Sequence, residues 1–326
     1  MLSRTAESLF WMARYMERAE TLARLLDAGR RFAALPAGPG GEASEWASIV
    51  IASGCSVTYP RPLEEADAQS VLHHLVFDID NPSSIYRCLQ QARDNCRAVR
   101  TAVTSEVWDA VNDSWIGIRE MEAEEAAAGR LAGFLEWTKA RGAHFRGSVE
   151  SSQLRNTGHA FLRLGTQIER ADATARLLDV KYHVLLPADQ RVGGGLDYLQ
   201  WVQILRAVNS RRAFRWVYRS EVRPDRVTHF LILNPENPRA LVTCYEIIVR
   251  QLDRLGLSHT DRLGARAMAR SIYAALLEGS VDEIFAFGLH EWLTKFIGDN
   301  NQVALAIAGD YGFGAITIPH ETVSEG

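Results

Sequence analysis

Two stretches of the chain place glutamate and arginine side chains in the same order and spacing. ERAETLARLLD at residues 17–27 and ERADATARLLD at residues 169–179 are identical at eight of eleven positions. A carboxylate in such a stretch could accept a proton or bind an amine or a metal ion, and a guanidinium group could hold a carboxylate or phosphate through two parallel hydrogen bonds. Glu17 and Glu169 are therefore the candidate catalytic residues of the sequence.

Helical spacing decides which of these side chains can meet. Neighbouring residues on a helix point about 100° apart, so Glu17 and Arg18 cannot pair with each other along one helix. Glu17 and Arg24 fall on one stripe of the helix. Glu20 lies four residues before Arg24, which can also reach Asp27. The second stretch repeats this pattern with Glu169, Asp172, Arg176 and Asp179.

Three interpretations of the pattern remain open. The two helices could pack around a pseudo-two-fold axis and satisfy each other in a buried ion-pair lattice, which holds register but contributes little net stability. They could instead face each other across a polar cleft that binds a ligand, or form a surface for a partner protein. The candidate residues for binding a substrate or partner are Arg14, Arg18, Glu20, Arg24, Arg170, Asp172 and Arg176.

A second pair of similar segments indicates an internal duplication. HHLVFDIDNPSSIYRCL (73–89) aligns with HFLILNPENPRALVTCY (229–245) at an offset of 156 residues, close to the 152 that separates the Glu-Arg stretches. Two similar offsets predict an ancestral unit of about 155 residues that was copied in tandem. We expect a single domain over 1–308, made of repeat one (1–150) and repeat two (151–308).

The spacing of apolar residues predicts an all-α fold, a helical bundle with roughly ten or more helices. The segment that begins with Asn81 and Pro82 offers a helix cap followed by a proline at the first helical position. Short β-branched runs at 48–53 and 228–234 have strand propensity, but no partner strands with hairpin turns accompany them. The Gly-rich, polar segment 309–326 is expected to be a frayed tail.

The composition is typical of a water-soluble globular protein. Of the 326 residues, 47% are hydrophobic and 23% are charged, and the mean hydropathy is −0.12. Charged residues interrupt the N-terminal segment, and no apolar run approaches the ~20 residues of a membrane span. We expect a cytoplasmic protein without a membrane partner. The cysteines are too widely spaced for a disulfide scaffold and are expected to be buried thiols: Cys55, Cys88, Cys96 and Cys244.

The net charge provides no general attraction to nucleic acid, because it is −4 with a pI near 6.2. The most basic segment, 206–226, interleaves aromatic residues with seven arginines, a combination that single-stranded nucleic acid could use. The acidic segment 120–130 supplies an internal counterpart. A solvated helix face or a patch between subunits is the simpler interpretation, so we expect no nucleic-acid partner, and a homo-oligomer remains open.

The usual catalytic signatures are absent from the sequence. It contains no phosphate-binding G-x-x-x-x-G-K-[ST] loop, no G-x-G-x-x-G fingerprint, no G-x-S-x-G elbow and no H-E-x-x-H pair. We predict no metal site, because His73 and His74 are neighbours whose side chains diverge on a helix. His159 and His183, which flank the second Glu-Arg stretch, are expected to be structural.

Four segments, in this order, resemble the bacterial alpha-E domain family, an all-helical family named for its Glu-Arg motif. They are MLSRTAESLFWMARYMERAETLARLLD (1–27), FLRLGTQIERADATARLLDVKY (161–182), FLILNPENPRALVTCYEIIVRQL (230–252) and GLHEWLTKF (288–296). The resemblance covers nearly the whole chain. It assigns the motif to Glu17 and Arg18 in the first copy and to Glu169 and Arg170 in the second.

The second copy departs from the first just before its motif. Thr166 and Gln167 stand where Arg14 and Tyr15 stand in the first copy. If the residues before the motif bind a ligand, the two copies do not bind it equally.

The resemblance also implies a functional context. Members of the family are typically encoded beside circularly permuted ATP-grasp proteins and transglutaminase-like proteases, which implies ATP-dependent amide ligation or peptide modification. The preferred hypothesis is an accessory or co-catalytic partner of an ATP-grasp amidoligase, which binds the ligase or its substrate through a Glu-Arg cleft. No cofactor is expected in this chain, since ATP and Mg²⁺ would belong to the partner. The rivals are a stand-alone enzyme with Glu17 and Glu169 as acid-base groups and arginine clamps, and a purely structural helical scaffold.

Overall fold

Helix-forming segments separated by short connections fill the part of the chain that the computed structural model describes, residues 1–36, 41–121, 130–183, 194–256 and 264–314. No strand occurs in these ranges, so the all-α prediction is confirmed. The helices up to residue 152 are α1 (Ser3–Phe32), α2 (Gly41–Ser53), α3 (Ala68–Val76), α4 (Ile85–Ala98), α5 (Ser105–Glu120) and α7 (Leu131–Ser152), with 3-10 turns at Leu63–Glu65 and Arg100–Ala102. The helices after it are α8 (Thr157–His183), α9 (Gly195–Ala207), α10 (Arg211–Tyr218), α11 (Pro224–Ile232), α12 (Leu241–Gly256), α13 (Gly264–Glu278), α14 (Val281–Phe287) and α15 (Leu289–Tyr311).

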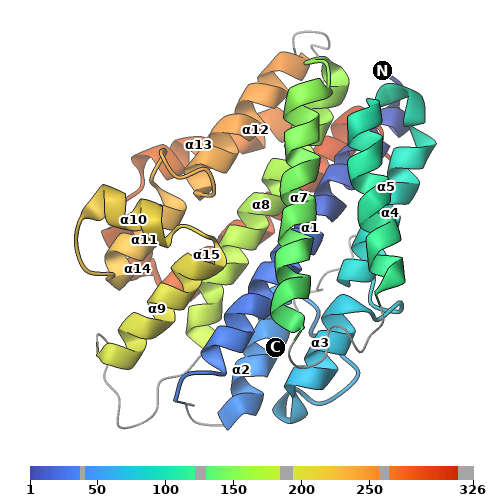
Figure 1. Ribbon diagram of the computed structural model, residues 1–326. Helices are drawn as coiled ribbons and strands as arrows, with labels where there is room; N and C mark the ends of the chain where they lie inside the picture. The colour runs from blue at the N-terminus through green and yellow to red at the C-terminus, as the bar shows by residue number, and fades with distance from the viewer. Residues whose placement is uncertain (37–40, 122–129, 184–193, 257–263, 315–326) are drawn as a thin grey trace.

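Two long helices, α1 and α8, form the centre of the molecule and carry one Glu-Arg stretch each. They pack against each other, and α1 also contacts α4 and α7 while α8 contacts α12 and α15 (Figure 1). The helices cross closely at Gly165, where an added Cβ would collide with the carbonyl oxygen of Phe10. This close approach buries Glu17, Arg18, Glu20 and Glu169 together with apolar residues of both helices.

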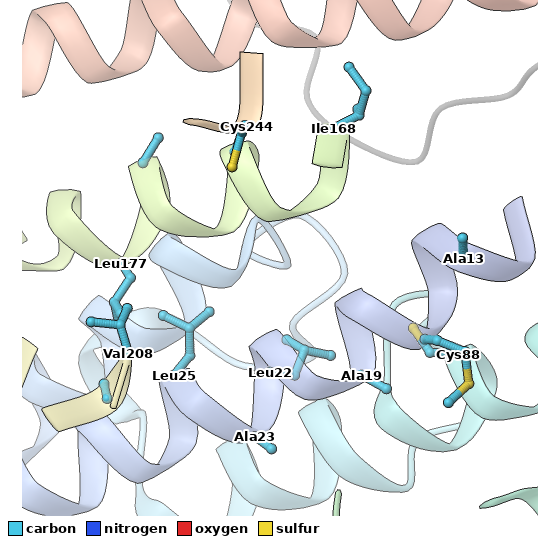
Figure 2. Close-up of a cluster of buried hydrophobic side chains, with 14 of the residues drawn as sticks. Ala13, Ala19, Leu22, Ala23, Leu25, Cys88, Ile168, Leu177, Val208 and Cys244 are labelled. Carbon is cyan, nitrogen blue, oxygen red and sulfur yellow. The ribbon is translucent and has the colours of Figure 1, made fainter. Parts of the chain in front are cut away.

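The apolar core continues from the α1 and α8 contact into both halves of the chain. Leu25 of α1, Leu177 of α8 and Val208, which follows α9, lie beside one another (Figure 2). All four cysteines are free and buried, as predicted. Burial raises the pKa of the Cys88 and Cys244 thiols to about 12, so both behave as small apolar groups.

The two halves share a turn that is built in the same way. The Asn81 side-chain amide donates to the His74 carbonyl oxygen at 2.9 Å, and Asn237 donates to the Phe230 carbonyl oxygen at 2.8 Å. Each asparagine oxygen also accepts from the backbone N–H two residues later. These bonds recur at the offset of 156 residues, while tandem copying of an ancestral unit stays a prediction.

One local expectation needs correction. Asn81 does not cap α4, because its side chain closes the preceding turn and Ser84 accepts the bond from the Arg87 backbone N–H at 3.2 Å. The β-branched run 48–53 lies inside α2, and 228–234 forms the end of α11 and the turn after it, so both runs agree with the all-α prediction despite their strand propensity.

The C-terminal prediction is partly wrong. Helix α15 continues to Tyr311 instead of ending before residue 309. Phe313 then packs its ring 5.7 Å from Phe10 and 6.0 Å from Phe161, which anchors the segment after the helix. The rest of the expected tail, 315–326, lies outside the described residues. Among the described helices, none combines the length and the apolar character that crossing a membrane requires.

The close crossing of α1 and α8 makes Gly165 sensitive to any added side chain. We expect Gly165→Ala to lower the free energy of unfolding by about 1–3 kcal/mol, since the backbone of α1 must move to admit the methyl group. Gly147, in the interior of α7 with open space around it, is the matched control. Gly147→Ala should raise stability by about 0.5–1 kcal/mol through helix propensity. Urea unfolding measures both, and an unchanged Gly165→Ala protein would contradict the close packing.

Candidate functional site

The two Glu-Arg motifs exchange partners across the crossing of α1 and α8. Arg18 donates from Nε to Glu169 Oε1 at 2.5 Å and from Nη2 to Glu169 Oε2 at 3.0 Å. Arg170 donates from Nε to Glu17 Oε1 at 2.8 Å and from Nη2 to Glu17 Oε2 at 2.9 Å. Both contacts are bidentate, which is the strongest geometry for a guanidinium and a carboxylate. The glutamate of each motif is therefore held by the arginine of the other.

Further arginines complete the two glutamate sites differently. Glu169 accepts a third bond from Arg14 Nε at 2.8 Å. At the position equivalent to Arg14 in α8, Thr166 donates to the backbone of its own helix instead. Glu17 forms an ion pair with Arg146 of α7, whose Nη1 lies 2.9 Å from the carboxylate. It forms another with Arg239, which lies just before α12 and places Nη1 at 3.4 Å. The departure noted at Thr166 thus corresponds to a real difference between the two sites.

Glu20 extends the network on the α1 side. It accepts from Arg24 Nη2 and from Arg239 Nη2, both at 2.7 Å, and it also contacts Arg146. The Glu20 carboxylate occupies the space where a side chain at position 142 would begin, and this is possible because that residue of α7 is Gly142. Arg24 uses its other arm to donate to the Ala207 carbonyl oxygen at 2.7 Å, at the end of α9. The network therefore ties four separate segments to α1.

Burial and the surrounding arginines shift the pKa values of the two glutamates in opposite directions. Burial alone raises the pKa of Glu17 and Glu169, but the adjacent arginines outweigh it, so the pKa of Glu169 falls to about 2 and that of Glu17 lies well below its usual range. The pKa of Arg239 falls to about 10, because burial and then the nearby charge of Arg24 disfavour the cation. Both glutamates are ionised at neutral pH, with side chains only 2% and 5% exposed.

This geometry corresponds to the ion-pair lattice and not to an open cleft. A carboxylate with its oxygens bound to arginines and a pKa near 2 is a poor proton acceptor at neutral pH, so a general-base role for Glu17 or Glu169 has no geometric support. Positive charge is in excess in the lattice. Among the described residues, three carboxylates, Glu17, Glu20 and Glu169, are surrounded by six guanidinium groups, from Arg14, Arg18, Arg24, Arg146, Arg170 and Arg239.

Some of the ion pairs predicted within a single helix are confirmed, and one is wrong. The predicted pairs four residues apart exist, Glu20 with Arg24 and Asp172 with Arg176, the latter at 2.7 Å. The prediction that Arg24 contacts Asp27 is wrong, because the Asp27 carboxylate forms ion pairs with Arg30, Arg31 and Lys139. Sequence reasoning missed Arg146 and Arg239, whose segments are distant in the chain. The only sequence signal for Arg239 was that an arginine follows the second Asn-Pro pair, whereas Ser83 follows the first.

A groove of about 780 Å³ opens beside the lattice, and we call it the basic groove. Arg24 belongs to both, so the groove and the buried lattice share one guanidinium group. Helices α1, α7 and α10 and the end of α9 supply its walls. The charged or polar residues that line it are Arg24, Asp27, Arg31, Glu136, Lys139, Arg206, Asn209, Arg211 and Arg212.

Cations in the basic groove exceed the carboxylates that could neutralise them. Its two acids are already engaged, since Asp27 holds Arg31 and Lys139 and Glu136 holds Lys139 at 2.6 Å. Within the described ranges, Arg206, Arg211 and Arg212 form no ion pair, and the buried Nε of Arg211 has no hydrogen-bond partner. Partial burial and then the charges of Arg211 and Arg31 lower the pKa of Arg206. An anion in the groove would relieve this repulsion.

Comparison with known proteins places the chain in a recognised group. A family model described as a predicted alpha-helical domain with a conserved ER motif matches residues 1–311. Uncharacterised proteins of Mycobacterium bovis and Mycobacterium tuberculosis are 27% identical to this chain over 292 residues, which is 82% of this chain and 30% of theirs. The chain spans about 30% of the length of these relatives. No solved structure matches it.

Removing one carboxylate should reveal how much the lattice depends on charge balance. We expect Glu169→Gln to lower the free energy of unfolding by about 3–5 kcal/mol, because Arg14 and Arg18 stay buried without an anion. The control is Glu136→Gln, an exposed pair whose loss should cost less than about 1 kcal/mol. Chemical denaturation at pH 7 measures both, and equal losses would refute a special role for the lattice.

The same carboxylate should make stability depend on pH in a defined window. The pKa of Glu169 is about 2 in the folded protein against an ordinary 4.5, so its contribution is fully present above about 4.5 and is lost as pH falls toward 2. Unfolding free energies between pH 7 and pH 3 should therefore fall less steeply in Glu169→Gln than in the wild type. Parallel curves for the two proteins would contradict the depressed pKa.

Proposed function

Because the chain belongs to the Alpha-E family, we propose that it is a non-catalytic binding module of an ATP-grasp amidoligase system, which holds a carboxylate-bearing peptide substrate in the basic groove. The single observation that carries this proposal is the groove itself, with three arginines that have no carboxylate partner in the described structure. An amide ligase consumes a carboxylate, and guanidinium groups bind carboxylates through paired hydrogen bonds. ATP and Mg²⁺ would be bound by the ligase.

The lattice supports a binding role for the groove, because it holds the Arg24 side chain in place. Arg24 is fixed by Glu20 and by the Ala207 carbonyl oxygen, so its position at the groove does not depend on a ligand. A preformed wall reduces the entropy lost on binding. The lengths of the mycobacterial relatives also support a module, since about 70% of each lies outside the aligned region.

The rival functions have less support in the geometry. A stand-alone enzyme would need an accessible acid-base group, and Glu17 and Glu169 are both buried and paired. A purely structural scaffold accounts for the lattice, but it gives no reason for repelling arginines along an open groove.

Peptide binding tests the groove directly. We expect a fluorescein-labelled decaglutamate peptide to bind, and a decaglutamine peptide not to bind, in an anisotropy titration. Arg206→Glu with Arg211→Glu should weaken decaglutamate binding by at least about tenfold, because a charge-assisted hydrogen bond contributes about 1.5–3 kcal/mol. The matched control is Arg97→Glu with Arg215→Glu, which changes net charge equally at two exposed arginines outside the groove. Equal weakening in both proteins would show general electrostatics and would overturn the assignment.

The ligase part of the proposal has its own test. We expect the chain to co-purify with a circularly permuted ATP-grasp protein expressed with it and to raise the turnover of that ligase on peptide substrates. The groove variant should keep the complex and lose the stimulation. No complex together with unchanged turnover would overturn the partnership, while peptide binding by the isolated chain would still be judged by the anisotropy titration.

A further inference from the structure

Three metal-ligating side chains meet where the C-terminal end of α8 lies against the start of α15. His290 of the GLHEWLTKF segment places Nδ1 at 2.7 Å from Asp179 Oδ1. His183, one helical turn after Asp179, places Nε2 at 3.4 Å from Asp179 Oδ2. One donor atom from each residue lies within 4.8 Å of the other two. Neither the lattice nor the basic groove uses these residues.

The cluster is sheltered but reachable from solvent. The side chains of Asp179, His183 and His290 are 12%, 19% and 27% exposed. A cavity of about 280 Å³ adjoins them, and Asp179 and His290 line it. The Tyr182 ring stacks on His290 with centroids 3.8 Å apart, which holds the imidazole in orientation. Lys181 also lines the cavity, and its ammonium group pairs with Asp197 at 3.0 Å.

The first Glu-Arg stretch shows what the same aspartate does without histidines. Asp27 occupies the position of Asp179, and its partners are cations, with Arg31 four residues later and Lys139 from α7. These groups donate hydrogen bonds and have no lone pair for a metal. In the second stretch His183 replaces the arginine, and His290 approaches from another helix. The exchange converts an ion-paired aspartate into a set of one oxygen and two imidazole donors.

We propose that Asp179, His183 and His290 bind a zinc-type divalent transition-metal ion, with a fourth position open to the adjoining cavity. Imidazole nitrogen and carboxylate oxygen are ligands that Zn²⁺ takes in proteins, and three protein ligands plus one water is the arrangement of open zinc sites. Donors of a tetrahedral zinc lie ~3.3 Å apart, so small side-chain rotations bring the cluster to binding distance. The Asp179 carboxylate would supply the negative charge, and the ion would clamp α8 to α15.

Metal titration of the EDTA-treated chain tests the site. We expect Zn²⁺ to bind at one equivalent by calorimetry, Co²⁺ to give the visible absorption of a four-coordinate site, and Mg²⁺ not to compete. His290→Ala and His183→Ala should each weaken Zn²⁺ binding at least about tenfold, with circular dichroism confirming the fold. Asp27→Asn and His144→Ala, an aspartate paired with cations and an exposed histidine, should bind as the wild type does.

Several outcomes would overturn the site. They are no binding by the wild type, retention of Zn²⁺ by both histidine variants, or equal loss in the two controls. If His290→Ala failed to fold, His183→Ala would decide alone, because His183 is the last residue of α8 and its removal leaves the helix core intact. Binding of decaglutamate by the EDTA-treated chain separates this proposal from that of the basic groove.

Discussion

The structure depends on the exchange of partners between two buried Glu-Arg motifs. A carboxylate removed from water stays ionised only when cations and hydrogen bonds replace its hydration, and here each glutamate is satisfied by the helix opposite its own. The crossing must then be close and its register fixed, which accounts for Gly165 at the contact. Replacing one motif without the other leaves a charge uncompensated, so the two stretches are constrained together. That constraint gives a physical reason why one chain carries the motif twice.

The lattice also shapes the surface next to it. Its guanidinium groups outnumber its carboxylates, which leaves an excess of positive charge. One of these guanidinium groups, that of Arg24, also lines the basic groove. Asp27 and Asp179 occupy equivalent positions at the ends of the two motif helices, yet one lies on the basic groove among cations and the other lies among histidines. The two motif helices thus meet in a shared lattice and differ toward their C-terminal ends. Functional differences between the two helices are expected at those ends.

The sequence predicted what is local and missed what the fold brings together. Apolar periodicity predicted the helices, and spacing of four residues predicted the Glu20 and Arg24 pair, because both depend on a single helix. The lattice was one of three open interpretations, since two motifs alone do not say whether they face a cleft or each other. Arg146 and Arg239 could not be assigned, because α7 and the segment before α12 reach Glu17 only in the folded chain. The His183 and His290 cluster was missed for the same reason.

A double-mutant cycle tests the reciprocal exchange most directly. Arg18 and Glu169 suit it, because they belong to different motifs and share two hydrogen bonds. The free energy of unfolding is measured for the wild type, Arg18→Gln, Glu169→Gln and the double variant. We expect the double variant to lose at least about 1.5 kcal/mol less than the two single variants lose together, because removing both partners leaves fewer buried charges unpaired. Losses that add within about 0.5 kcal/mol would contradict it, because the two motifs would then not hold each other.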